Sequence, residues 1–364
     1  MEFGSREDEA RPWKSLGFIT CDLRGVKKPA GSRRDEMIRR NLQISNRFWP
    51  PDRLTLSKSG TYTGPMTNRR RITAGFLVAA CALALCSTLG AQSRQRSMYV
   101  SVVNDAGAPV ADLGPSDFIV REDNMAREVL KVEPALEPMQ VAVLVDTSQA
   151  ARNDISHMRT ALPGFVKTLT GGAVKNEVAI IAIGERPTVF TNYTTNPAEL
   201  KKGIDRIWST QGSGAYLLDA IIETCQGFKK REAQRPVIVA ILSEGPELSS
   251  RHHDQALDPL KSNGAAFHAI TMGRPSSSVA EEFRERNMVL DEAPRLTGGR
   301  REELLTPMGL DPKLAQLGDE LTHQYKITYA HPDTLIPPER VTVAAAKAGF
   351  TARGTLIKEA KARQ

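Results

Sequence analysis

The stretch Val141-Ala142-Val143-Leu144-Val145, followed directly by Asp146, decides the fold of this 364-residue chain. A continuous apolar run of this length, with three valines, is typical of a strand buried on both faces of a parallel sheet. Similar runs recur further along the chain, at 178–183, 237–242 and 265–270. Segments with helical spacing of apolar residues lie between or after them, at 154–169, 197–208, 215–230, 256–261 and 312–321. This alternation predicts an α/β domain over residues 136–330, doubly wound around a mostly parallel sheet.

Both flanks of this domain predict β-structure. Residues 97–134 hold short β-branched runs separated by the turn signals Asn104-Asp105-Ala106-Gly107 and Asp123-Asn124, and we interpret them as a small β segment. Residues 331–364 hold two further strand-like runs and a tail. We hypothesise that these closing strands pair with the early β segment.

A leader precedes the β segment. Residues 66–91 follow the three-part pattern of a secretory signal peptide: three arginines by Arg71, an apolar stretch from Ile72 to Leu89, and small residues ending at Ala91. We therefore expect cleavage near Ala91 and an exported protein, periplasmic or extracellular. Two alternatives stay open. The apolar stretch approaches the length of an uncleaved membrane anchor, and Val78-Ala79-Ala80-Cys81 resembles a bacterial lipoprotein box.

Residues 1–65 stand before this signal, although an export signal acts from the N-terminus. They show no sustained apolar period, so we interpret them as disordered or as non-native upstream sequence, with Met66 as the true start. Residues 1–71 hold 16 Lys and Arg against 8 Asp and Glu, whereas the whole chain carries a net charge of only +7. The basic character belongs to the leader, and we expect no nucleic-acid partner.

The decisive strand runs into Asp146-Thr147-Ser148-Gln149-Ala150, and a second predicted strand ends in Ser243-Glu244-Gly245. In open α/β sheets, ligands bind outside the carboxyl ends of the strands, which is where Asp146 and Glu244 are expected. These segments, in this order, make residues 98–356 resemble the bacterial VWFA-related proteins of the von Willebrand factor type A family. The other segments that carry the resemblance are Asp117-Phe118 with Glu122-Asp123, Leu296-Thr297-Gly298-Gly299, and Gln324-Tyr325 with Tyr329.

The resemblance implies a Rossmann-like fold and a metal-dependent adhesion site. In the family, an Asp followed by two alternate serines opens this site, which holds Mg²⁺ with one position free for an acidic group of the partner. Asp146 and Ser148 match the first two positions, but the third is Ala150. The second loop supplies a threonine in the family and has Ala215 here, and the third loop has Glu244 in place of Asp.

Mg²⁺ needs near-octahedral oxygen coordination, so each missing ligand weakens the site. We therefore predict a degenerate site with no required cofactor, in which Asp146, Ser148 and Glu244 are the remaining candidate ligands. Ca²⁺ tolerates looser geometry and stays an alternative ion. Without a metal, Asp146 and Ser148 are expected to cap the following turn through bonds to the backbone.

The sequence assembles no nucleophile, base and oxyanion donor, so we do not expect an enzyme. His268, inside an apolar run, is interpreted as a core residue with satisfied hydrogen bonds. We expect a protein-interaction module that binds a protein partner through the loops at the carboxyl edge of the sheet, with Ser213 and Tyr216 among the contact residues. The alternatives are a membrane-anchored envelope scaffold and an adhesion domain with a working Mg²⁺ or Ca²⁺ site.

Overall fold

The computed structural model describes residues 94–274, 281–332 and 338–358. The interpretations of residues 1–65 and of the signal peptide at 66–91 therefore lie outside the described residues. Within the described ranges, no helix has the length and apolar character needed to span a bilayer.

A six-stranded sheet forms the centre of the α/β domain. In spatial order its strands are β10 (Arg301–Leu304), β9 (Ala266–Met272), β8 (Arg235–Ser243), β5 (Met139–Val145), β6 (Glu177–Ala182) and β7 (Thr188–Thr194). All neighbouring strands are parallel except β6 and β7, which are antiparallel. The predicted doubly wound, mostly parallel α/β fold is thereby confirmed.

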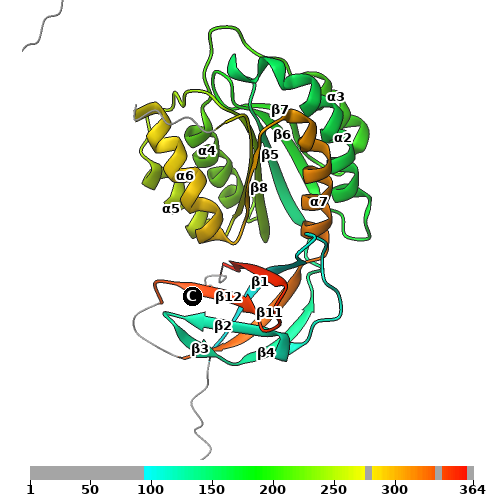
Figure 1. Ribbon diagram of the computed structural model, residues 1–364, viewed down its shortest axis with the longest axis vertical. Coiled ribbons are helices and arrows are strands. Elements are labelled where there is room, and N and C mark those ends of the chain that lie inside the picture. The colour runs from blue at the N-terminus through cyan, green and yellow to red at the C-terminus, as the bar shows by residue number, and fades with distance from the viewer. Residues whose placement is uncertain (1–93, 275–280, 333–337, 359–364) are drawn as a thin grey trace, which may run out of the picture. The chain divides into compact units, whose positions relative to one another are not determined.

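Helices cover both faces of this sheet (Figure 1). One face packs against α2 (Ile155–Gly171), α3 (Pro197–Asp205) and α7 (Leu310–Thr322), and the other against α4 (Leu217–Lys230), α5 (His253–Asn263) and α6 (Glu281–Thr297). Alternate side chains of β5 enter the two cores: Val143 lies in the first and Leu144 in the second, both fully buried. The decisive apolar run is continuous because helices cover both faces of its strand.

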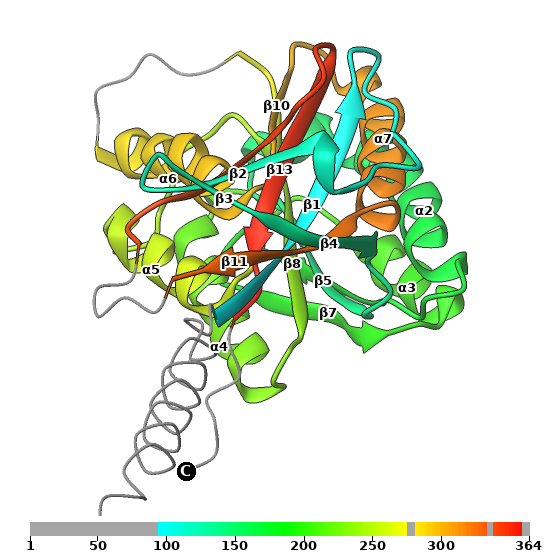
Figure 2. The same cartoon turned by 90° about the horizontal axis from the view of Figure 1, so that it is seen from below.

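The flanking segments form two smaller sheets (Figure 2). The four-stranded sheet has the order β13 (Phe350–Leu356), β1 (Arg94–Asn104), β11 (Tyr325–His331), β4 (Val129–Pro134). The three-stranded sheet has the order β12 (Val341–Ala345), β2 (Phe118–Glu122), β3 (Met125–Arg127). Because β13 pairs with β1 and β12 pairs with β2, the hypothesis that the closing strands join the early β segment is confirmed.

The structure differs from the predicted division of the chain at β11. That division placed residues up to 330 in the α/β domain, whereas β11 pairs antiparallel with β1 and β4. Its side chains alternate between buried and partly exposed, which is the pattern of an antiparallel sheet with one covered face. Two elements were also not predicted: α6, which begins with a run of charges, and the edge strand β10, which reads Arg-Glu-Glu-Leu.

Short 3-10 helices complete the described secondary structure, at Pro115–Asp117, Ala150–Asn153 and Pro307–Gly309.

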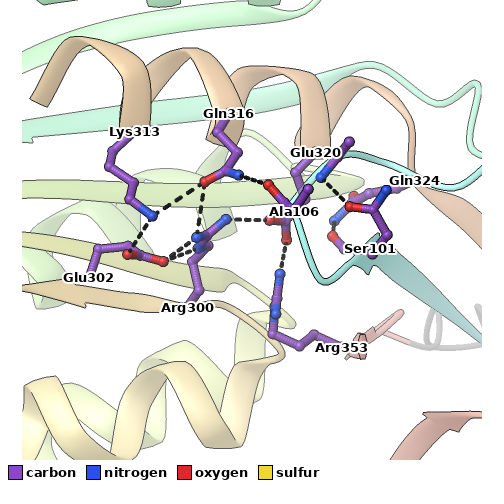
Figure 3. A network of polar contacts seen from close by, with 11 residues as sticks. Ser101, Ala106, Arg300, Glu302, Lys313, Gln316, Glu320, Gln324 and Arg353 are labelled. Carbon is purple, nitrogen blue, oxygen red and sulfur yellow. Dashed lines mark hydrogen bonds and ion pairs between the residues drawn. The ribbon is translucent and has the colours of Figure 1, made fainter. Parts of the chain in front are cut away.

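A polar network joins α7 to the four-stranded sheet (Figure 3). Glu320 of α7 is buried, and its carboxylate accepts hydrogen bonds from Arg300 Nη1 at 3.0 Å and from Arg353 Nη2 of β13 at 2.8 Å. Just beyond α7, Gln324 Nε2 donates to the buried Ser101 Oγ of β1 at 2.8 Å. Buried polar groups need such partners, so α7 is fixed to β1 and β13 by specific geometry as well as by apolar packing.

Candidate functional site

The candidate residues lie where the strand order of the large sheet reverses. β5 has β6 on one side and β8 on the other, so the loops that follow β5 and β8 flank the switch point at which α/β sheets bind ligands. Asp146 follows β5, while Ser243 ends β8 and precedes Glu244. The structure thus brings the first and third predicted loops together.

Asp146 is fully buried and both of its carboxylate oxygens are engaged by backbone groups. Oδ1 accepts from the Ser148 amide at 2.8 Å, and Oδ2 accepts from the Ser243 amide at 3.1 Å. Burial raises the pKa of Asp146, while the bonds from Ser148 and Ser243 and the charge of Arg286 act in the opposite direction. Asp146 therefore ties the two loops to one another through their backbones.

The first loop keeps one of the two expected hydroxyl groups. Ser148 is buried, and its Oγ makes no hydrogen bond of good geometry among the described residues, although it lies close enough to the Asp146 carboxylate to lower the pKa of that group. At the next serine position of the family, Ala150 presents a methyl group toward the third loop: a Cβ on Gly245 would lie only 2.6 Å from it. The first and third loops therefore pack closely around a methyl group.

The second loop offers no free hydroxyl at this place. Ala215 is buried, and its backbone bridges the third loop, donating to Pro246 O at 3.0 Å and accepting from the Leu248 amide at 2.7 Å. Ser213 Oγ donates to Thr210 O at 2.8 Å within its own loop. The position expected to hold a threonine ligand is therefore apolar and fixed.

Ser213 and Tyr216, the predicted contact residues, are both half-buried and line one open pocket of about 310 Å³. Glu185, Gln211 and Leu248 are also among its lining residues. The pocket thus opens between the loop that follows β6, the loop before α4 and the loop that follows β8.

The cation at this edge of the sheet is Arg286 of α6, which the sequence analysis did not single out. Its side chain is 1% exposed. Nη2 donates to Ser243 O at 2.8 Å, and Nη1 donates to Gly245 O at 2.9 Å and lies 3.4 Å from Glu244 Oε2. Arg286 stands in a run of charged residues that reads as a solvated helix face, so the sequence gives no signal of its burial.

Glu247 is a second carboxylate that sequence reasoning missed. It is 3% exposed and accepts from the amides of Leu217 at 2.9 Å, Leu218 at 3.4 Å and Ser249 at 3.1 Å. It therefore caps the N-terminus of α4 from a loop distant in sequence, where the helix dipole favours negative charge. Burial raises the pKa of Glu247, and these hydrogen bonds counter the rise.

His268 corrects an expectation. It is fully buried, but neither ring nitrogen has a hydrogen-bond partner among the described residues, so the ring is not satisfied. All residues of β9 are buried, which leaves the ring away from water. Burial accordingly lowers the pKa of His268 to about 4.

The residues present do not fit the magnesium ion that the family resemblance implies. Mg²⁺ needs several oxygens in near-octahedral geometry. Ser148 offers one unpartnered hydroxyl, but Ala150 and Ala215 offer no side-chain oxygen, and both oxygens of Asp146 already accept backbone hydrogen bonds. Within the described ranges, no group of three or more His, Cys, Asp or Glu side chains is placed to hold a metal ion. The degenerate site stays a prediction that metal titration tests.

Comparison with known proteins gives a family and a set of similar folds. The family model "von Willebrand factor type A domain" matches residues 140–289. Similar solved structures include a von Willebrand factor type A protein from Catenulispora acidiphila, with 14% identity, coverage of 73% of this chain and 72% of that chain, and a TM-score of 0.41. BatB from Bacteroides thetaiotaomicron, a conserved hypothetical protein, has 12% identity, coverage of 50% and 98%, and a TM-score of 0.40.

Proximal thread matrix protein 1 from the mussel byssus has 16% identity and a TM-score of 0.43, and the match covers 56% of this chain and about half (51%) of that one. The comparison with curated proteins gave no match. The predicted resemblance to the von Willebrand factor type A family is confirmed over residues 140–289, which match the model of that domain.

Proposed function

We propose that the chain is an exported protein-interaction module, which binds a protein partner through the loops at the carboxyl edge of the six-stranded sheet and needs no divalent metal to do so. Export rests on the signal-peptide pattern of residues 66–91. The binding surface rests on the structure of the loops.

The observation that carries the proposal is a group of exposed apolar side chains at this edge. They are Trp208, Leu248, Leu305 and Met308, with exposed fractions of 65%, 41%, 75% and 77%. Exposed large apolar side chains in loops are what protein interfaces bury, and Trp and Met are enriched there. We call these four residues the edge patch.

Backbone contacts support a position of Trp208 and Leu248 beside the candidate site. Thr210, two residues after Trp208, donates its amide to Thr147 O at 2.8 Å. Leu248 donates its amide to Ala215 O, and Leu305 and Met308 follow the carboxyl end of β10. The guanidinium of Arg159 lies 4.8 Å from the centre of the Trp208 ring, a cation–π contact that orients the ring while leaving it exposed.

We further propose that the module is not an enzyme. The two buried carboxylates of the site, Asp146 and Glu247, each accept backbone hydrogen bonds, which suits them to hold loops in place rather than to exchange protons with a substrate.

A pull-down from the native cell envelope tests the proposal, with the mature chain as bait. Trp208→Ser is expected to lose the partner, because Trp residues at interface centres contribute most of the binding energy. Leu136→Ser is the matched control, since Leu136 is 70% exposed but lies between β4 and β5, away from the edge patch. Recovery of the same partner by both variants would exclude the edge patch as the binding surface.

The same experiment separates the alternatives. A partner that is released by EDTA would support a metal-dependent adhesion domain, for which the unpartnered Ser148 hydroxyl is the favouring observation. Cell fractionation distinguishes a cleaved module from an anchored scaffold, because only the scaffold would sediment with membranes.

A further inference from the structure

Arg286 is the largest fully buried side chain among the described residues. A guanidinium carries its charge at any physiological pH, and a buried charge must be paired and hydrogen-bonded to be tolerated. The surroundings of Arg286 therefore have to supply negative charge and acceptor oxygens. Those surroundings are the third loop of the candidate site.

The contacts of Arg286 are those of a bound cation. Two backbone carbonyls of the third loop, Ser243 O and Gly245 O, accept from its two terminal nitrogens at 2.8 and 2.9 Å. The carboxylate of Glu244 lies 3.4 Å from Nη1, and Glu244 is 17% exposed, so this pair is largely removed from water. One guanidinium thus gathers three oxygens from three consecutive residues.

Arg286 brings positive charge to a site that holds several carboxylates: Asp146, Glu244, and Asp154, which accepts from Ser243 Oγ at 2.6 Å. Asp146 and Glu244 follow neighbouring parallel strands, and two carboxylates at one sheet edge repel one another unless a cation lies close. In the metal-dependent sites of the family that cation is a divalent ion. Here α6 delivers a guanidinium to the third loop, while Ala150 and Ala215 stand where the ion would need oxygens.

We infer that Arg286 takes the place of the divalent cation: it holds the loop after β8, to which Asp146 ties the loop after β5, so that this edge of the sheet neither needs nor binds a metal. Arg286 is a positioning residue, because it fixes backbone carbonyls and does not reach the edge patch through any described contact. The inference concerns how the site is held together. Its test needs no partner, so its failure would leave the proposed partner binding standing and would bear only on whether that binding needs a metal.

The test compares thermal unfolding of the wild type, Arg286→Gln and Arg286→Lys in EDTA, in millimolar Mg²⁺ and in millimolar Ca²⁺. Arg284→Gln is the matched control, because Arg284 lies two residues earlier on α6 and is 62% exposed. We expect the wild type and the control to have the same midpoint in all three conditions. Arg286→Gln is expected to unfold at least about 5 °C lower in EDTA, because it removes a buried, multiply bonded cation.

The change in unfolding midpoint on adding Mg²⁺ or Ca²⁺ shows whether Arg286 replaces the charge of a metal ion or has only a structural role. Arg286→Gln leaves Asp146 and Glu244 uncompensated, so Ca²⁺, with its looser geometry, should raise the midpoint of this variant and of no other. Arg286→Lys keeps the charge and should show no response to either ion. Adding Ala150→Ser to Arg286→Gln restores a hydroxyl and should extend the response to Mg²⁺, whereas Ala150→Ser alone should not respond.

Two outcomes would overturn the inference. One is heat of Mg²⁺ or Ca²⁺ binding to the wild type in a calorimetric titration that disappears in Asp146→Asn. The other is an Arg286→Gln chain that gains nothing from either ion, whether it is folded or stays unfolded, because a divalent ion would then not be interchangeable with the guanidinium.

Discussion

At the scale of single residues, burial of His268 makes the stability of the fold depend on pH. Its pKa is lowered to about 4 from an ordinary value of 6.5, with burial as the main cause. Between these values the unfolded chain binds a proton that the folded chain does not, so stability is lost as the pH falls from about 6.5 toward about 4. One such proton contributes a slope of up to about 1.4 kcal/mol per pH unit.

We therefore expect His268→Leu to flatten the pH dependence of the free energy of unfolding in this window. Urea unfolding at a series of pH values measures it. His323→Leu is the control, because the His323 ring is exposed and its hydrogen bond is to the backbone carbonyl of Asp319 at the end of α7. An unchanged slope in His268→Leu would show that the buried ring is protonated in the folded chain.

The residues of the site were predictable from sequence to different degrees. Asp146 was placed correctly at the carboxyl edge because it directly follows a continuous apolar strand, and parallel strands end at one edge. Arg286 was not predictable, since burial of a charge depends on the tertiary contacts of its helix face and not on its neighbours in the chain. The same limit applies to Glu247, whose partners are about thirty residues away.

At the scale of elements, α4 begins without a side-chain cap of its own. Tyr216 occupies the N-cap position and makes no side-chain cap bond. The amides of Leu217 and Leu218 are satisfied by Glu247, and the amide of Asp219 donates to Ser249 Oγ at 3.1 Å. The loop after β8 therefore caps a helix that precedes that strand, which makes the start of α4 dependent on tertiary structure.

Glu247→Ala should accordingly destabilise the fold by about 2 kcal/mol or more, because three amides lose their acceptor and two of them open a helix. Ser249→Ala removes one acceptor and should lower the free energy of unfolding by about 1 kcal/mol. Chemical denaturation of both variants provides the comparison. Equal effects would mean that water replaces Glu247 as the cap.

The strands and helices show which sequence patterns are reliable. Continuous apolar runs correctly predicted β5, β6, β8 and β9, because a strand covered by helices on both faces has apolar residues at successive positions. β10 escaped prediction because it is a short edge strand with three charged residues among its four. α6 was not predicted because its first turns are charged. The most deeply buried side chain in those turns is itself an arginine, Arg286.

At the scale of the whole molecule, the α/β domain and the flanking sheets share one backbone path. α7 packs on the large sheet and leads within a few residues into β11. In the four-stranded sheet, β11 lies between β1 and β4. The sequence patterns predicted these parts as separate units, because each pattern is local to one segment of the chain. Pairing of β1 with β11 and β13 spans more than two hundred residues and leaves no local trace.

Glu320 is the carboxylate on which this connection depends, so its removal is the prediction at this scale. Burial raises its pKa, but the charges of Arg353 and Arg300 and the hydrogen bond from Arg353 hold the pKa below its ordinary value. Its contribution to stability is therefore present above the pKa of the unfolded chain and is lost as the pH falls through the lowered pKa of the folded chain.

Glu320→Gln leaves Arg300 and Arg353 facing one another without their shared carboxylate. Removing one partner of a buried ion pair leaves the other charges buried without compensation. We therefore expect the free energy of unfolding to fall by about 3 kcal/mol, as measured by denaturant titration at neutral pH. Glu302→Gln is the control: Glu302 also contacts Arg300 but is 22% exposed, and its loss should be below about 1 kcal/mol. Equal stability of the two variants would mean that the contact of Arg353 in β13 contributes nothing to holding the flanking sheet on α7.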